Sequence, residues 1–238
     1  MHCNMAECIN KFEVYLVRHG QSMGNIGHGG RDDVSFTDKE DPVLSPDGLR
    51  QAQLLGKRFE ALPLDFVFSS GLRRTLSTAN EVVKAQPENG AKEIEIIPEL
   101  SETGVPEEYF GFTLAEFKQT YPVLLAKGMD SKRLIVTSKG TDDFWNLERA
   151  QKIWQYLHSR FNSGEKIMLT AHGNFNTSLF LSALKIPPQT GFDVSFSNTG
   201  VTKFIFYQKG TGRYGDDVVV SYLNDTSHLY SEFPKVML

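Results

Sequence analysis

Short apolar runs alternate with longer amphipathic stretches along most of the chain. Runs of four or five residues rich in Val, Ile, Leu and Phe are typical of buried strands. Stretches in which apolar residues recur every three or four positions predict helices that pack by one face. This pattern predicts strands at 13–17, 65–68, 93–97 and 166–170, and helices that begin near 45 and 72 or span 113–126, 142–161 and 174–184.

The first long helix carries the clearest start signal. Ser45 is a preferred N-cap residue, Pro46 suits the first helical position, and Asp47 places an acid in the first turn. The apolar face expected behind this start consists of Leu49, Ala52, Leu55, Phe59 and Leu62.

Two segments lack a clear period. Residues 20–44 are rich in glycine and predict a long irregular segment, and loops of that length are commonly functional. Residues 127–141 are also expected to be irregular. The apolar positions in phase on the predicted helix at 113–126 are Leu114, Phe117 and either Leu124 or Leu125.

The alternation of strands with helices predicts the fold class. Such a pattern is typical of an α/β three-layer sandwich, with a mostly parallel central sheet and helices on both faces. Residues 201–208 and 217–223 predict a C-terminal β-hairpin at the sheet edge. We expect one domain at 12–238 after a leader at 1–11, with a substrate-region insertion at about 104–141.

Composition narrows the classes of function. The 238 residues carry 25 Lys and Arg against 29 Asp and Glu, a formal net charge of −4. An acidic chain is a poor match for general binding to nucleic acid or to an anionic membrane. No apolar run reaches the roughly 18 residues that cross a bilayer, and no secretory signal is recognisable, so a cytoplasmic location is expected. Cys3 and Cys8 are expected to be reduced thiols on the leader.

Polar side chains follow four of the predicted strands at the point where each strand ends. In a parallel sheet these carboxyl ends lie along one edge, which is where ligands bind. Each of two histidines follows an apolar strand and precedes a glycine that lets the backbone turn sharply. The four strand ends supply Arg18-His19-Gly20, Ser69-Ser70 with Arg73-Arg74, Glu99 and Glu102, and Ala171-His172-Gly173-Asn174.

Two histidines and two or three arginines around one point would form a pocket for an anion. Arginine suits bidentate contact with phosphate oxygens. Histidine can act as a covalent nucleophile, and a nearby carboxylate can protonate a leaving oxygen. Taken alone, each histidine motif is more often a solvated turn or capped loop, and Glu102 is more often a solvated acid in a first turn. The Ser-Ser-x-Leu-x-Arg segment alone is equally explained as a helix cap with a surface arginine. Their occurrence at four strand ends favours a site for phosphoryl transfer through a phosphohistidine.

Longer segments around these residues carry a resemblance to a known family. They are LVRHGQSMGN (16–25), LSPDGLRQAQLLG (44–56), VFSSGLRRTLSTA (67–79), PELSETGVPEEYFGFTLAEFKQTYP (98–122), MLTAHGN (168–174), NTGVTKF (198–204) and LNDTSHL (223–229). Over about 14–229, the chain resembles the histidine phosphatase superfamily, in the branch of cofactor-dependent phosphoglycerate mutases and fructose-2,6-bisphosphatases.

The resemblance implies a role for each matching position. His19 would be the nucleophile that becomes phosphorylated. Glu102 would protonate the leaving group and then activate water. The other catalytic residues, which hold the phosphate, would be Arg18, Arg74 and His172, with Arg74 rather than its neighbour matching the family's Ser-Ser-x-Leu-x-Arg pattern.

The resemblance also implies further contacts. Asn25 would donate to a phosphate oxygen, and Gly173 and Asn174 would contribute substrate or phosphate contacts. Gln21 and Gly71 replace the family's commoner Glu and Pro without removing a chemical role. No metal and no other cofactor are implied. The expected partner is a small phosphorylated substrate, and the oligomeric state stays open.

We expect an enzyme that hydrolyses phosphomonoesters rather than a mutase. The resembled mutases carry a long arginine-bearing stretch of the Arg-His-Tyr-Gly type after the acidic residue, whereas this chain has GVPEEYFGFTLAEF at 104–117. The alternatives are a 2,3-bisphosphoglycerate-dependent phosphoglycerate mutase and a non-catalytic relative that binds phosphorylated ligands. The intact set of expected catalytic residues counts against the non-catalytic alternative.

The insertion offers two interpretations for its charges. A solvated charged loop is favoured, and a second anion site is the alternative. Its cations are Lys127, Lys132, Arg133 and Lys139. The aromatic side chains that would line the entrance, or pack beneath the insertion, are Tyr109, Phe110, Phe112 and Trp145.

Overall fold

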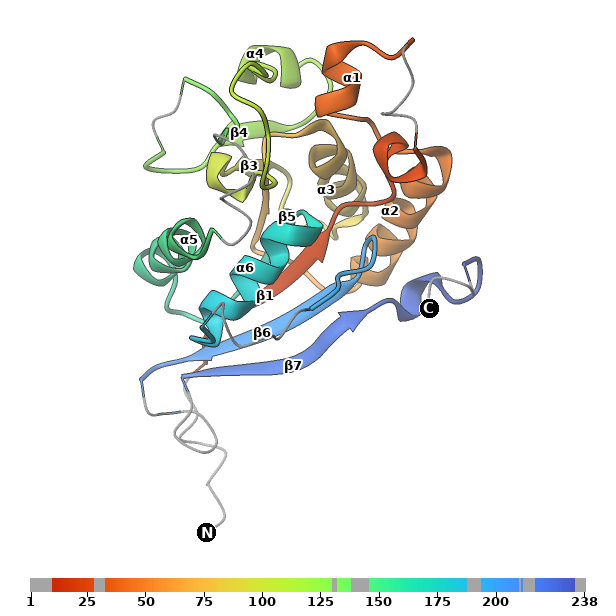
Figure 1. Ribbon diagram of the computed structural model, residues 1–238. Coiled ribbons are helices and arrows are strands. Elements are labelled where there is room, and N and C mark those ends of the chain that lie inside the picture. Colours follow the sequence, from red (N-terminus) through yellow and green to blue (C-terminus); the bar gives the residue numbers. More distant parts are fainter. Residues whose placement is uncertain are drawn as a thin grey trace.

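The computed structural model describes residues 10–27, 33–129, 132–137, 146–187, 194–209, 211 and 217–233. Its strands are β1 (Asn10–Arg18), β2 (Phe66–Ser69), β3 (Ile94–Ile96), β4 (Val123–Leu125), β5 (Glu165–Ala171), β6 (Val201–Tyr207) and β7 (Val218–Asp225). They form a seven-stranded sheet in the order β4-β3-β2-β5-β1-β6-β7 (Figure 1). The first five strands of that order pair in parallel, and β6 and β7 form an antiparallel hairpin at one edge. The predicted sheet and its hairpin are confirmed.

Helices cover both faces of this sheet (Figure 1). One face carries the packed pair α2 and α3, and the other carries the packed pair α5 and α6. No described helix is long and apolar enough to cross a membrane. The helices are α1 (Phe36–Glu40), α2 (Pro46–Phe59), α3 (Arg73–Ala85), α4 (Leu114–Phe117), α5 (Leu147–Arg160) and α6 (Gly173–Ala183), with short 3₁₀ turns η1 (Met23–Ile26), η3 (Pro98–Leu100) and η6 (Ser227–Leu229).

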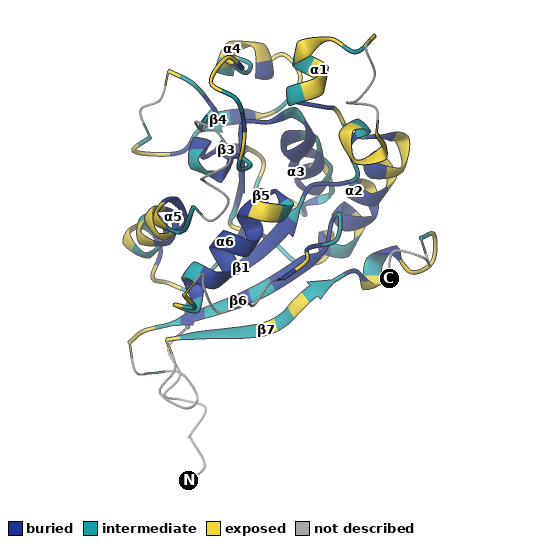
Figure 2. Cartoon of the chain, in the orientation of Figure 1, coloured by how far each residue is buried: buried dark blue, intermediate teal, exposed yellow. Residues whose placement is uncertain are grey.

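Strand β1 shows how the sequence divides the core between the two faces. Successive side chains of a strand point to opposite faces. Leu16 belongs to the apolar cluster that contains Trp154 of α5. Val17 belongs to the cluster that contains Leu55 of α2 and Leu76 of α3. Because both faces are covered, β1 is buried on both sides (Figure 2), which explains its continuous apolar run.

Helix α2 begins as predicted. The Ser45 hydroxyl accepts the backbone N–H of Gly48 at 3.0 Å, which satisfies one of the free donors of the first turn. Ala52, Leu55 and Phe59 of the expected apolar face are buried, and Leu62 is partly buried beyond the end of α2. Leu49 is 43% exposed, so its assignment to this face was wrong. At this end α2 contacts the turn after β1 through Gly48. The Leu49 side chain lies about 100° further round the helix and therefore points toward solvent.

The predicted helix at 113–126 is wrong over most of its length. Only α4 is helical, with Thr113 and Glu116 forming a capping box at its start. Pro122 then interrupts the helical pattern, because proline disfavours the helical conformation in the residue before it. The following residues form β4 instead and pair in parallel with β3.

Several element boundaries also differ from the predicted ones. β1 starts at Asn10 and therefore extends into the predicted leader, because its first residues pair with β6. The segment 20–44 contains the one-turn helix α1, which is too short to produce a recognisable period. α5 starts at Leu147. The predicted helix start at 142–145 and both cysteines lie outside the described residues, whereas 127–129 and 132–137 are irregular as expected.

A close backbone contact joins the turn after β1 to the first turn of α2. A Cβ atom added to Gly48 would lie 1.8 Å from the carbonyl oxygen of Gln21, and one added to Gly20 would lie 2.4 Å from the carbonyl oxygen of Gly48. Such distances leave no space for a side chain. The two glycines therefore set how closely α2 approaches the end of β1.

Gly48→Ala is expected to lower the free energy of unfolding by at least about 2 kcal/mol, because the new methyl group forces the two segments apart. At an ordinary helix position the same change stabilises by about 1 kcal/mol, so the sign is diagnostic. Urea denaturation measures the effect. Lys57→Ala, on the exposed side of α2, is the control and should stay within about 0.5 kcal/mol of wild type. A Gly48→Ala protein as stable as the control would contradict the contact.

Candidate active site

The carboxyl ends of the central parallel strands bring the predicted polar residues together. Arg18 ends β1 and pairs in register with Ala171, the last residue of β5, so His19 and His172 leave the sheet side by side. Their ring centroids lie 5.3 Å apart in an edge-to-face arrangement. Arg74, on the first turn of α3, lies close enough that its charge lowers the pKa of both histidines.

His19 is held as a neutral imidazole with one nitrogen available. Its side chain is 4% exposed, and Nδ1 lies 2.7 Å from the carbonyl oxygen of Gly20. A carbonyl can only accept, so Nδ1 carries the hydrogen and Nε2 carries the lone pair. Burial, and then the charges of Arg74 and Arg18, hold the pKa of His19 well below its ordinary value. Nε2 is therefore a nucleophile at neutral pH.

Three hydrogen bonds from two segments anchor the backbone around His19. Its N–H donates to the Ala171 carbonyl at 3.0 Å, and its carbonyl accepts from the Asn198 side chain at 3.0 Å. The N–H of Thr199 donates to the carbonyl of Arg18 at 2.9 Å. The Asn-Thr-Gly segment before β6, which is part of the family resemblance, thus fixes the position of this histidine.

His172 is completely buried at the start of α6. Its Nε2 lies 2.8 Å from the hydroxyl of Ser70, which in turn lies 2.7 Å from the hydroxyl of Thr75. Nδ1 is buried and has no hydrogen-bond partner among the described residues. Burial, followed by the charge of Arg74, lowers the pKa of His172 well below its usual value. The ring is therefore fixed on one side and free to contact a ligand on the other.

Arg74 is buried and Arg18 is half-buried, and among the described residues part of their donor capacity is unused. Arg18 donates from Nη1 to the carbonyl of Phe196 at 2.7 Å, while its Nε is buried without a hydrogen bond. Nη1 of Arg74 is likewise buried without a hydrogen bond, and burial lowers the pKa of both side chains. Unsatisfied buried donors of this kind favour an anionic ligand.

Gly173 leaves space for the side chain of Arg18, and its expected contact with substrate or phosphate stays a prediction. A Cβ atom at this first position of α6 would lie 3.4 Å from Nε of Arg18, so the guanidinium group lies against the start of the helix. This is the close approach that the absence of a side chain permits.

Arg73 and Arg74 play different parts. Arg73 turns away from the histidines and donates from Nη2 to Asp38 at 2.7 Å, which ties α1 to α3. Arg74 points to the histidines and lies 3.5 Å from Oδ1 of Asp41. This placement agrees with the assignment of Arg74, rather than Arg73, to the phosphate pocket.

Asp41 is a component that the sequence did not reveal. It is fully buried and accepts the backbone N–H of Arg73 at 2.9 Å and the hydroxyl of Tyr109 at 3.1 Å. Burial raises the pKa of Asp41, and the charge of Arg74 opposes this effect. Asp41 therefore links Arg74 to the loop after Glu102. It lies in an aperiodic segment, and only its tertiary partners distinguish it from an exposed loop residue.

Glu102 lies at the amino terminus of α6. Its Oε1 accepts the N–H groups of Phe175 at 3.0 Å and Thr103 at 2.9 Å, and Oε2 lies 3.4 Å from the N–H of Asn174. Helix amino termini favour negative charge, so this position holds the carboxylate near Arg18 and Arg74. The N–H of Asn174 is used by Glu102, and the expected contact of Asn174 with substrate or phosphate stays a prediction.

Asn25 occupies the exposed edge of the site. Its Oδ1 accepts the N–H of Ser22 at 3.0 Å and the Ser22 hydroxyl at 3.1 Å, which closes a capping box around η1. This orientation reserves the amide NH₂ group for other partners. The role of Asn25 as a donor to phosphate stays a prediction.

The aromatic residues of the insertion divide into two kinds. Tyr109 is buried and Phe112 packs under the guanidinium of Arg73, so both contribute to packing. Phe110 is 66% exposed and stacks with Arg133, whose guanidinium carbon lies 4.1 Å from the ring centroid. Trp145 and Lys139 lie outside the described residues.

The site combines nitrogen donors with the carboxylates of Glu102 and Asp41. Among the described residues, no three or more His, Cys, Asp or Glu side chains gather closely enough to hold a metal ion. The guanidinium groups of Arg18 and Arg74 supply positive charge beside the two histidines. This arrangement can bind a phosphoryl group, present a nucleophile to it and place a proton carrier at its edge.

The chain is similar to one known protein family and to several known proteins. The family model of the histidine phosphatase superfamily, branch 1, matches residues 14–214. A 2,3-bisphosphoglycerate-dependent phosphoglycerate mutase of Chlamydia muridarum is 29% identical over 199 residues, covering 72% of this chain and 83% of the mutase. A probable phosphoglycerate mutase of Cronobacter sakazakii is 25% identical over 225 residues, covering 91% and 94%.

Solved structures share the fold at low identity. A phosphoserine phosphatase of Entamoeba histolytica, crystallised with 3-phosphoglyceric acid, has a TM-score of 0.58 and 23% identity and covers 92% of this chain and 99% of its own. Bacillus stearothermophilus YhfR has a TM-score of 0.62 and 24% identity, with the same coverage. The names of curated relatives thus include mutases, and those of structural neighbours include a phosphatase.

The free energy of unfolding is expected to fall as the pH drops below about 6.5, the ordinary pKa of histidine. His19 and His172 have lowered pKa values in the folded protein and stay neutral there, but they gain a proton when the chain unfolds. Acid therefore favours the unfolded chain, by about 1.4 kcal/mol per pH unit for each histidine until its folded-state pKa is reached. Urea unfolding between about pH 8 and pH 5 measures this slope.

His19→Asn supplies the matched comparison, because the amide N–H can still donate to Gly20 while one titrating group is lost. The difference in unfolding free energy between wild type and variant should be constant above about pH 7.5 and change by about 1.4 kcal/mol per unit below about pH 6.5. Curves that stay parallel over the whole range would show that His19 does not titrate in this way.

Proposed function

The chain belongs to the histidine phosphatase superfamily, branch 1, and we propose that it hydrolyses a phosphomonoester of a small metabolite through a phosphohistidine on His19. One observation carries the proposal. Nδ1 of His19 donates to the Gly20 carbonyl, so Nε2 keeps its lone pair beside the guanidinium groups of Arg18 and Arg74. Nucleophilic attack on a phosphate ester requires a neutral nucleophile and fixed positive charge.

In the first step, Nε2 of His19 attacks phosphorus as the bond between phosphorus and the leaving oxygen breaks. Arg18 and Arg74 bind the equatorial oxygens, where negative charge is concentrated in the transition state, and His172 completes this set of contacts. Glu102, in its protonated form, transfers its proton to the leaving oxygen. The products are the free alcohol, the phosphohistidine and the Glu102 carboxylate.

In the second step, water replaces the alcohol. The Glu102 carboxylate removes a proton from the water as its oxygen attacks phosphorus, and the phosphorus–nitrogen bond breaks. Inorganic phosphate leaves, His19 regains its lone pair, and Glu102 is protonated again. The backbone N–H groups that hold Glu102 support this exchange, since they keep the carboxyl group at one place in both steps.

Hydrolysis is preferred over mutase activity because of the segment that follows Glu102. A mutase has to hold a second phosphorylated molecule and keep water away from the phosphohistidine. Residues 104–117 carry no Arg or Lys that would hold another phosphoglycerate, and Tyr109 within them is used to support Asp41. The mutase alternative is favoured by the names of the curated relatives. The complete set of charged groups around His19 argues against a non-catalytic protein.

Wild-type protein is expected to release phosphate from p-nitrophenyl phosphate, and His19→Ala to lower kcat by about 10³-fold or more, because no phosphohistidine can form. Glu102→Gln should lower kcat/KM, which reports the first step, by about 10²–10⁴-fold for glycerol 2-phosphate and much less for p-nitrophenyl phosphate, since nitrophenolate leaves without a proton. Equal rates for wild type and His19→Ala would sink the phosphohistidine mechanism. Equal losses on both substrates would remove Glu102 as the acid.

A second assay separates phosphatase from mutase. Incubation with 3-phosphoglycerate and 2,3-bisphosphoglycerate is expected to yield inorganic phosphate, because water reaches the phosphohistidine. Phosphate release and 2-phosphoglycerate formation can be followed in the same reaction by ³¹P NMR. Rapid interconversion of the two monophosphoglycerates, with little free phosphate, would assign the chain to the mutases instead.

A further inference from the structure

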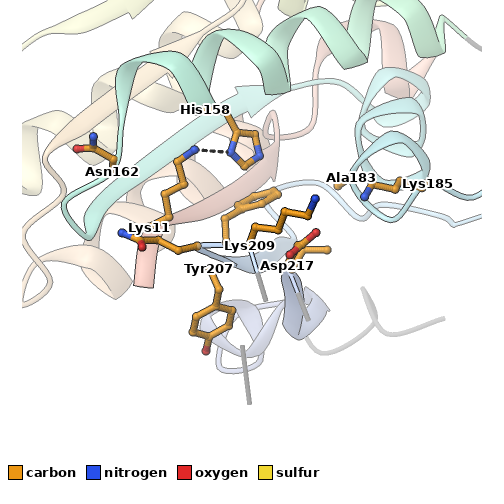
Figure 3. A pocket seen from close by; sticks show the side chains of 11 residues that line it. Lys11, His158, Asn162, Ala183, Lys185, Tyr207, Lys209 and Asp217 are labelled. Carbon is orange, nitrogen blue, oxygen red and sulfur yellow. Dashed lines mark hydrogen bonds between the residues drawn. The ribbon is translucent and has the colours of Figure 1, made fainter. Parts of the chain in front are cut away.

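The end of the sheet opposite the candidate active site contains a second polar cavity. β1 runs from this end to Arg18, so Lys11 lies about 23 Å from Arg18 along an extended strand. The cavity has a volume of about 470 Å³, within the range of small-molecule sites. Its lining includes Lys11, His158, Lys185, Phe206, Lys209 and Asp217 (Figure 3).

Positive charge dominates this cavity. Lys11, Lys185 and Lys209 contribute three cations against the single carboxylate of Asp217, in a chain whose net charge is −4. The carboxyl ends of α5 and α6 also face this end of the sheet, and helix carboxyl ends carry partial negative charge. The three ammonium groups outweigh these contributions. In the part of the chain that the structure describes, none of the three forms an ion pair.

Lys11 points at a neutral partner rather than at a carboxylate. Its Nζ lies 3.1 Å from Nδ1 of His158, and Figure 3 shows the two side chains meeting at one side of the cavity. An ammonium group can only donate, so Nδ1 accepts and Nε2 of His158 carries the hydrogen. Burial and then Lys11 lower the pKa of His158, in agreement with a neutral ring. The charge of Lys11 is therefore positioned but not neutralised.

Lys185 is held in place by a backbone conformation that usually belongs to glycine. Its φ is 56°, and it follows α6 where the N–H of Ile186 donates to Leu181 at 2.9 Å and its own N–H donates to Ser182 at 3.2 Å. This pair of bonds is a Schellman ending, in which glycine is preferred because a Cβ atom is strained there. A lysine at this position makes the fold less stable than a glycine would, and it places an ammonium group beside the cavity.

The cationic cavity continues into an apolar one. A neighbouring cavity of about 440 Å³ shares His158, Lys185 and Phe206 with it and extends along α5 to Trp154 and Ile186. One end of the combined groove is therefore positively charged and the other is apolar. This combination suits a ligand with an anionic group and a hydrocarbon portion. A charged surface loop alone would not require an apolar cavity beside it.

We propose that this groove is a binding site for a carboxylate with an apolar tail. The carboxylate lies among Lys11, Lys185 and Lys209, and the tail follows α5 toward Trp154. A single negative charge suits the site better than a phosphate dianion, because Asp217 and two helix carboxyl ends lie nearby and no guanidinium fork is present. The proposal is independent of the phosphatase assignment.

Octanoate is the probe, with acetate and octanol as the head-only and tail-only comparisons. Histidine ring resonances in ¹H–¹³C NMR spectra of the full chain report binding, and His158→Asn identifies the His158 signal. Octanoate is expected to shift that signal saturably, with acetate and octanol at least about tenfold weaker. Because the readout is local to His158, octanoate bound at the candidate active site does not interfere.

Two lysine variants test the proposed contacts. Lys11→Met and Lys185→Gly should each weaken octanoate binding about tenfold, whereas Lys118→Met, an exposed lysine after α4, should leave it unchanged. Lys185→Gly removes the backbone strain, so its Tm should equal that of wild type or rise by up to about 4 °C, and loss of binding cannot then reflect unfolding.

The proposal is overturned if octanoate at up to about 20 mM gives no saturable shift of the His158 signal, because a specific site would be filled well below that concentration. It is equally overturned if acetate or octanol binds as tightly as octanoate. The same holds if the two variants retain wild-type affinity, since the lysines would then not contact the ligand.

Discussion

Keeping positive charge inside the protein is the constraint on which this structure depends most. Arg74 is buried and Arg18 is half-buried beside two imidazoles, and removing a guanidinium group from water is costly unless its donors are satisfied. The fold supplies part of this compensation through the Phe196 carbonyl and the nearby charge of the Asp41 carboxylate. Within the described residues, Nε of Arg18 and Nη1 of Arg74 have no hydrogen bond, and the same surroundings hold the pKa of both histidines low. A bound phosphoryl group would complete this compensation, so binding and the neutrality of the nucleophile have one physical origin.

The parallel sheet meets this constraint because it aligns the ends of strands that are distant in the sequence. β1 and β5 are in register to their last residues, so the two histidines emerge together. Close packing then limits how far the turn after β1 can move, since Gly20 and Gly48 leave no space between that turn and α2. Asp41 and Tyr109 extend the same rigidity to Arg74 and to the loop that follows Glu102. The site is thus supported by backbone contacts more than by its own side chains.

Helix α6 relates the two ends of the molecule. Its amino terminus lies at the candidate active site, where free N–H groups hold the carboxylate of Glu102. Its carboxyl terminus lies at the opposite groove, where the chain turns through the strained residue Lys185. Cations at the first end are buried around a nucleophile, whereas those at the second end line an open cavity beside apolar side chains. The difference in burial explains why the first arrangement suits chemistry and the second suits binding.

The sequence by itself determined six of the seven strands of the sheet, the principal helices, and the placement of Arg18, His19, Arg74, Glu102 and His172 at strand or helix ends. These features follow from local periods, caps and the rule that parallel strands share an edge. Four features were decided only by the tertiary structure. Residues 123–125 form a strand rather than the predicted helix, Leu49 is exposed, Asp41 is buried, and a groove forms around His158. Each depends on a neighbour remote in the chain, such as β3 for β4, or Arg74 and Tyr109 for Asp41. A local pattern carries no information about such partners, because their effect arises only when the folded chain brings them into contact.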